Sequence, residues 1–128
     1  MAFKRARYTG PSREVVAIVA ARSAGWCEFP GCEHRAQDVH HRYERGMGGH
    51  SERLTWINEP PNLLAACRHH NYWCSNVTPE EARQMGWRVR RGDMPWQVPV
   101  QTRHDPLPVY LANDGTFSLF ADNPPEVQ

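Results

Sequence analysis

Metal-binding side chains constrain this chain more than its apolar residues do. Its 128 residues include four cysteines and seven histidines, whereas hydrophobic residues make up only 40% of the sequence and the mean hydropathy is −0.71. A chain this polar can bury little apolar surface, and a bound metal is a common additional source of stability. The length predicts one domain over residues 1–128, with a core at about 25–92 and a hairpin extension at 93–121.

The chain also lacks the apolar segments that direct a protein into or across a membrane. No apolar run approaches the ~18 residues of a transmembrane helix. Residues 1–5 (MAFKR) contain no apolar stretch of the kind found in signal peptides. We therefore expect a cytoplasmic protein with reduced thiols, in which cysteines serve metal binding more often than disulfides.

Four candidate zinc ligands occur as two close pairs. The pairs are Cys27-x4-Cys32 and Cys67-x2-His70. Zinc is bound tetrahedrally by such residues, and pairs on tight turns deliver two ligands at a time. Pro30-Gly31 predicts a turn inside the first pair. Cys74 is an alternative fourth ligand and His69 a weaker one, and the thiols could instead be ordinary buried cysteines.

Two adjacent histidines, His40 and His41, lie between these pairs. Residues 36–42 are predicted to form a short strand, in which neighbouring side chains point to opposite faces. The two imidazoles are therefore suited to different tasks. The apolar run at 62–67 is too short for its period to separate strand from helix, but pairing it with 36–42 would give a hairpin with a long connection.

The order of these residues resembles the HNH endonuclease family, most closely its small phage-encoded members. The shared pattern is a cysteine pair, a His-His pair, an asparagine before a short apolar run, and a second pair followed at once by His or Asn. In this chain the two asparagines are Asn62 and Asn71. The resemblance covers about residues 25–75. It implies a ββα-metal core with a zinc knuckle, activity on DNA, and phage packaging (terminase) proteins as candidate partners.

The resemblance also implies a role for each site residue. His41 would be the general base, and Asn62 would hold the hairpin and orient that base. His40 and Asn71 would bind the catalytic divalent ion. The structural zinc would be held by Cys27, Cys32, Cys67 and His70, although relatives usually have cysteine at the position of His70.

The chemistry of phosphodiester hydrolysis independently suits these residues. The reaction needs a base that titrates near neutral pH, as histidine does, and a cation that stabilises charge on the phosphate and the departing oxygen. One nitrogen and one oxygen ligand leave most coordination positions open for water and phosphate. Mg²⁺ prefers oxygen, whereas a histidine ligand also admits Mn²⁺, Ni²⁺ or Zn²⁺.

Candidate DNA contacts are arginines near these residues. Fourteen of the fifteen basic residues are arginine, which suits bidentate phosphate contacts, although the formal net charge is only +1. We expect Arg42, Arg45, Arg88 and Arg90 to contact DNA, with solvated surface charge as the alternative. Affinity that depends on so few cations should fall steeply with salt.

The flanking segments predict a small α+β fold. A helix should begin at Pro11-Ser12 and end at Gly25, and a second should begin at Thr78-Pro79 and end at Gly86. Residues 87–91 alternate apolar and basic side chains, which predicts a strand, and 93–108 should be irregular. Asn-Asp-Gly at 113–115 predicts a β-hairpin.

Two other functions remain open from the sequence. A non-catalytic zinc module that binds DNA or a partner protein would need the cysteine and histidine pairs but would use His40 and His41 for packing. An enzyme that acts on branched or modified DNA would share every feature above. Strand scission in the presence of divalent metals would separate the first alternative from a nuclease.

Overall fold

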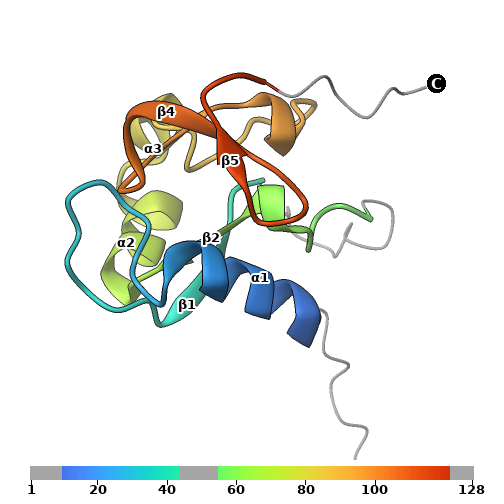
Figure 1. Ribbon diagram of the computed structural model, residues 1–128. Coiled ribbons are helices and arrows are strands. Elements are labelled where there is room, and N and C mark those ends of the chain that lie inside the picture. The colour runs from blue at the N-terminus through green and yellow to red at the C-terminus, as the bar shows by residue number, and fades with distance from the viewer. Residues whose placement is uncertain (1–9, 44–54, 122–128) are drawn as a thin grey trace, which may run out of the picture.

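The computed structural model describes residues 10–43 and 55–121, which form short helices and two small antiparallel sheets (Figure 1). The α-helices are α1 (Arg13–Ser23), α2 (Arg68–Tyr72) and α3 (Pro79–Gln84), and one sheet consists of β1 (Asp38–His41) and β2 (Leu63–Ala66). The other sheet consists of β3 (Val100–Thr102), β4 (Asp105–Leu111) and β5 (Phe117–Ser118). The chain is therefore α+β, as the sequence predicts. Among these residues no helix combines the length and apolar character needed to cross a bilayer.

The β1–β2 sheet separates two parts of the core. Its antiparallel register pairs His41 with Leu63 and His40 with Leu64. Because side chains alternate between faces, Leu63 and Ala65 pack with Val19 of α1, whereas Leu64 and Ala66 pack with the cysteines on the other face. α1 and the cysteine cluster thus lie on opposite faces of this sheet.

The first helix begins and ends close to the predicted positions. The Ser12 hydroxyl accepts a hydrogen bond from the backbone N–H of Val15 at 3.2 Å. The helix ends at Ser23, and the left-handed residue Ala24 (φ 55°) and then Gly25 (φ 84°) turn the chain away. The glycine tolerates this conformation at little cost and ends the helix.

The predicted strand at 87–91 is wrong. The structure gives only an isolated parallel bridge between Tyr43 and Val89. The backbone N–H groups of Trp87 and Arg88 both donate to the carbonyl of Ala82, so this segment begins as a continuation of the turn that ends α3. Burial does alternate along this segment, since Trp87 and Val89 are buried and Arg90 is exposed. A single bridge, however, is too short a pairing to form a strand.

The expectation of irregular backbone at 93–108 is also wrong. Strand β3 and most of β4 lie within it, paired with Val100 opposite Val109. Proline removes a ladder donor and argues against a strand. Here Pro106 and Pro108 precede the part of β4 that pairs with β5, which begins at Tyr110, so no hydrogen bond to β5 is lost. The predicted hairpin around 113–115 is present.

A buried ion pair joins α1 to both sheets. Arg22 donates to both carboxylate oxygens of Glu28, at 2.8 and 2.9 Å, and both side chains are 0% exposed. The same carboxylate accepts from the backbone N–H of Ala65 at 2.8 Å and contacts His104 Nε2 at 2.7 Å. These contacts on both carboxylate oxygens compensate the buried charge.

Removing this carboxylate should strongly destabilise the fold. Glu28→Gln leaves Arg22 as an uncompensated buried cation and should lower the free energy of unfolding by about 3–5 kcal/mol. Urea denaturation measures the difference. The matched control is Glu80→Gln, whose exposed pairs with Arg83 and Arg90 should contribute no more than about 1 kcal/mol. Equal effects of the two substitutions would contradict this view of Glu28.

The same carboxylate should make stability depend on acid pH. Burial, the largest influence, opposes ionisation, but hydrogen bonds from His104, Arg22 and Ala65 outweigh it, so the pKa of Glu28 lies below its ordinary 4.5. A lowered folded-state pKa stabilises the fold fully above the ordinary value, and the contribution is lost as pH falls through the folded-state pKa. Lowering the pH from 7 to about 3 should therefore reduce the free energy of unfolding less in the Glu28→Gln variant than in the parent. Urea denaturation of both proteins at the two pH values measures this difference.

Candidate metal centres and catalytic site

The two predicted ligand pairs converge on one point. The metal-binding atoms of Cys27, Cys32, Cys67 and His70 all lie within 4.8 Å of one another. The first pair flanks the predicted turn, in which Gly31 has φ 74° and the backbone N–H of Cys32 donates to the carbonyl of Phe29 at 3.1 Å. A left-handed residue is required there, which explains the glycine.

The second pair is positioned by the start of α2. Cys67 is the residue that caps this helix, and its sulfur accepts from the backbone N–H of His70 at 3.4 Å. The ring of Phe29 stacks on the imidazole of His70, with centroids 3.9 Å apart and planes 8° apart. Capping and stacking together fix the orientation of the imidazole toward the three sulfurs.

The geometry fits a tetrahedral zinc ion. In such a site, with Zn–S bonds of about 2.3 Å, two sulfurs lie roughly 3.8 Å apart. Cys32 Sγ and Cys67 Sγ are 3.9 Å apart, and Cys27 Sγ lies 3.7 Å from His70 Nδ1. Burial raises the pKa of Cys27 to about 12, so without a cation the thiol keeps its proton. The cluster could therefore hold a metal such as zinc. Cys74 is buried in the same core, but its sulfur is not among these four atoms.

A second convergence involves His40 and Asn71. His40 is 2% exposed and faces α2, where its Nδ1 lies 2.9 Å from Asn71 Oδ1. Its Nε2 lies 2.6 Å from the carbonyl oxygen of Trp87. Since a carbonyl only accepts, Nε2 carries the N–H and the neutral ring keeps its lone pair on Nδ1.

Asp38 fixes which end of the Asn71 amide faces that lone pair. Asn71 Nδ2 lies 3.3 Å from Asp38 Oδ2, so the amide nitrogen donates to the carboxylate and the amide oxygen points at His40. Asp38 and His40 share a face of β1 because they are two residues apart. Sequence reasoning missed Asp38, and its position two residues before His40 is the signal that could have identified it.

Two acceptor atoms thus face each other across 2.9 Å. A proton on Nδ1 would turn one of these acceptors into a donor, but burial, the largest influence, lowers the pKa of His40 despite its hydrogen bonds to Trp87 and Asn71. A divalent cation bound by both atoms would also remove the repulsion between their lone pairs. Neighbouring octahedral ligands at about 2.1 Å from such an ion lie roughly 3.0 Å apart. The donor set therefore fits a divalent cation.

His41 lies on the opposite face of β1 and is only partly buried. Its Nε2 is 2.7 Å from Asn58 Oδ1, so Nε2 carries the N–H that donates to this amide oxygen. In the neutral ring, Nδ1 then carries a lone pair. Sequence reasoning did not select Asn58, because a polar residue in a long connection gives no indication of its partner.

Asn62 ties the end of β1 to the turn that carries Asn58. Its side chain is 1% exposed; Oδ1 accepts from the backbone N–H of Tyr43 at 2.8 Å, and Nδ2 donates to the carbonyl of Ile57 at 2.8 Å. The residue thus holds the connection of the β1–β2 hairpin. Through Ile57 it fixes the backbone beside Asn58, which contacts His41.

The expectation that Arg42 contacts DNA is wrong for this structure. Its side chain is 0% exposed and donates four hydrogen bonds of 2.7–2.9 Å to backbone carbonyls. Burial lowers its pKa to about 9, and repulsion from Arg22 adds to the effect. A guanidinium in this environment supports the fold and does not reach a phosphate.

The other predicted DNA contacts differ in accessibility. Arg90 is exposed and lies 3.5 Å from Glu80. Arg88 is half-buried and donates to the carbonyls of Cys74 and Ser75, at 3.4 and 3.1 Å. Arg45 lies outside the described residues. Among the predicted arginines that the structure describes, Arg90 presents its charge most fully to solvent.

Comparisons of the chain with models of protein families, with curated proteins and with solved structures found no match. The side-chain geometry contains two donor sets, one of sulfur and nitrogen atoms and one of nitrogen and oxygen atoms, and both include residues of α2.

The first donor set should bind one zinc ion per chain. Cys32→Ala should lose it, because three ligands hold zinc far less tightly than four, whereas Cys74→Ala should retain it. His70→Cys should also retain zinc, since thiolate is an equivalent ligand. Elemental analysis of the purified proteins measures the content. Loss of zinc from the Cys74 variant, with retention in the Cys32 variant, would show that the ligand set is assigned wrongly.

Proposed function

We propose that this chain is a metal-dependent DNA endonuclease of the HNH type, built on a ββα-metal core. It would hydrolyse phosphodiester bonds to leave 5′-phosphate and 3′-hydroxyl ends. The observation that carries the proposal is the convergence of His40 Nδ1 and Asn71 Oδ1 at 2.9 Å, two atoms that can both bind a divalent cation. The cysteine and histidine cluster would hold a structural zinc beside this pair.

The arrangement around His40 supports the proposal in detail. Histidines that bind metals commonly donate their second ring N–H to a backbone carbonyl or a carboxylate, which fixes the ring and its tautomer. Trp87 supplies that carbonyl at 2.6 Å. Asp38 fixes the orientation of Asn71 in the same way, because its carboxylate accepts a hydrogen bond from the amide nitrogen. Both ligands are therefore held in their binding orientations by neighbouring groups.

His41 is proposed to take a proton from the attacking water. His40 and His41 are adjacent but point to opposite faces of β1, so the phosphate would lie at the end of this strand, between the two side chains. The bond to Asn58 orients the His41 ring, and Asn62 holds the turn that carries Asn58. When bound, a Mg²⁺, Mn²⁺ or Ni²⁺ ion would stabilise negative charge on the phosphate and the leaving oxygen.

One observation favours a second candidate, a zinc-stabilised module that binds DNA or protein without cutting. His40 is almost fully buried, and both of its ring nitrogens lie within hydrogen-bonding distance of protein atoms. A histidine in such surroundings can serve packing alone. This candidate predicts DNA binding without strand scission in every metal, which the experiment below tests directly.

The nuclease should convert supercoiled plasmid to nicked or linear DNA in Mg²⁺, Mn²⁺ or Ni²⁺. His41→Ala should lower the cleavage rate by about 10²–10⁴-fold, because it removes the general base, while zinc content and circular dichroism stay unchanged. The matched control is His34→Ala, which removes an exposed imidazole and should cut at the parent rate. Undiminished cleavage by the His41 variant would reject His41 as the base.

Asp38 should control the affinity of the second metal site. Asp38→Ala frees the Asn71 amide to rotate and should weaken Mn²⁺ binding to the zinc-loaded protein by about 10–100-fold. Asp38→Asn should restore part of this affinity, because its amide oxygen still accepts from Asn71. The electron paramagnetic resonance signal of free Mn²⁺ measures binding, with Asp93→Ala as the control for loss of an exposed carboxylate. Equal affinities in all four proteins would contradict the assigned orientation of Asn71.

A further inference from the structure

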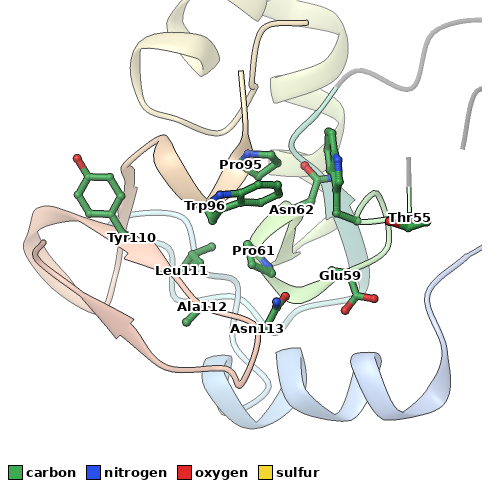
Figure 2. Close-up of a pocket in the computed structure, with 11 residues that line it drawn as sticks. Thr55, Glu59, Pro61, Asn62, Pro95, Trp96, Tyr110, Leu111, Ala112 and Asn113 are labelled. Carbon is green, nitrogen blue, oxygen red and sulfur yellow. The ribbon is translucent and has the colours of Figure 1, made fainter. Parts of the chain in front are cut away.

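A cavity of about 850 Å³ lies between the turn before β2, the single helical turn at Pro95–Gln97 and the end of β4 (Figure 2). Its volume falls within the range of roughly 300–1,000 Å³ that is usual for small-molecule sites. Trp56 and Trp96 contribute aromatic surfaces to its lining, and Pro61 contributes an apolar one. None of these residues has a part in either metal site.

The aromatic walls are held in place by their neighbours. The rings of Trp56 and Trp96 meet at 84° with centroids 5.9 Å apart, and Tyr43 packs edge-on against Trp56 at 4.9 Å. Because the two indoles are nearly perpendicular, a flat ligand can stack on the face of one and contact the edge of the other. Such surfaces bind any planar ring, and bases of single-stranded nucleic acids commonly stack on aromatic side chains in this way.

One acidic residue at the cavity distinguishes between planar ligands. Among the described residues of the lining, Glu59 is the one that carries a carboxylate. A planar ligand that suits it carries a hydrogen-bond donor on its edge. Cytosine combines a carbonyl and ring nitrogen with an amino group, and acidic side chains accept hydrogen bonds from that amino group.

The cavity adjoins the turn that carries Asn58, the partner of the proposed general base. Asn58, whose amide oxygen contacts His41, lies between Trp56 and Glu59 in the chain. Asn62, which holds this turn, is itself part of the lining. A nucleotide whose phosphate lies at the end of β1 would therefore have its base, or a neighbouring base, close to the cavity.

We propose that this cavity binds an unpaired DNA base that carries an amino group, cytosine in the first instance, next to the bond that is cut. The inference rests on the proposed nuclease function and deepens it, because it assigns the enzyme to DNA with an extruded or unpaired base. The base would stack on the indole of Trp96, and Glu59 would accept a hydrogen bond from its amino group. A fully paired duplex offers no base to the cavity.

Binding to labelled duplexes tests this inference, with zinc-loaded protein and no other divalent ion. A duplex with one unpaired cytosine should bind roughly 10-fold more tightly than the same duplex with an abasic site at that position, because the stacked base is lost. Fluorescence anisotropy measures both. Replacing the unpaired cytosine by thymine should also weaken binding, because thymine has no amino group for Glu59.

Three variants connect the effect to the cavity. Glu59→Gln changes only the carboxylate and should remove the preference for cytosine over thymine. Trp96→Ala removes the stacking surface and should reduce the preference for cytosine over the abasic site. Phe120→Ala removes an aromatic side chain that is 79% exposed and lies outside the cavity, so it should bind as the parent does. Unchanged preferences in both the Glu59 and Trp96 variants would overturn the assignment.

Plasmid cleavage by the same proteins separates this inference from the proposed function. If no metal supports cleavage but the base preferences and their loss in the variants are found, the nuclease proposal fails and the base site stands. If cleavage occurs but the cytosine and abasic duplexes bind equally, the base site is overturned and the nuclease stands. Saturable binding of a proline-rich peptide, lost in the Trp96 variant and accompanied by no base preference, would also overturn it.

Discussion

The structure depends on a buried cation that is stabilised by hydrogen bonds to backbone carbonyls. Arg42 directly follows β1, and its guanidinium bonds the carbonyls of Pro61, Gly86, Pro95 and Val98. Within the described part of the chain, the segments that carry these four carbonyls are not paired with one another in a sheet. Bonds to charged groups are stronger than neutral ones. A polar chain with short strands thereby gains the long-range connections that a larger apolar core would otherwise supply.

The helix α2 links the two donor sets. Cys67 precedes it, His70 lies within it, and Asn71 follows directly in the same turn. The two groups of atoms therefore share one rigid support of five residues. Any force that reorients this helix moves a sulfur cluster and an amide oxygen together. Through this helix, stability at the first set is coupled to geometry at the second.

The features that were predictable from sequence are those encoded by neighbouring residues. A capping serine, an Asn-Asp-Gly turn and two close ligand pairs each specify geometry within a few positions of the chain. The burial of Arg42 was not predictable, because its partners are carbonyls from distant segments that any residue could supply. The strand expected at 87–91 failed for a similar reason: alternation reports which side chains are buried but not whether a partner strand is present. Asp38 and Asn58 acquire significance only through contacts made by folding.

The pleat of β1 has a consequence for how this chain can change over time. Successive residues of the strand enter different environments, one enclosed by α2 and one partly open to solvent. Inserting one residue before His40 would shift the strand by one position and turn each imidazole to the opposite face of the sheet. Point substitutions in this region alter one environment at a time, whereas an insertion or deletion alters both. We therefore expect the length of this segment to be held more strictly than its composition.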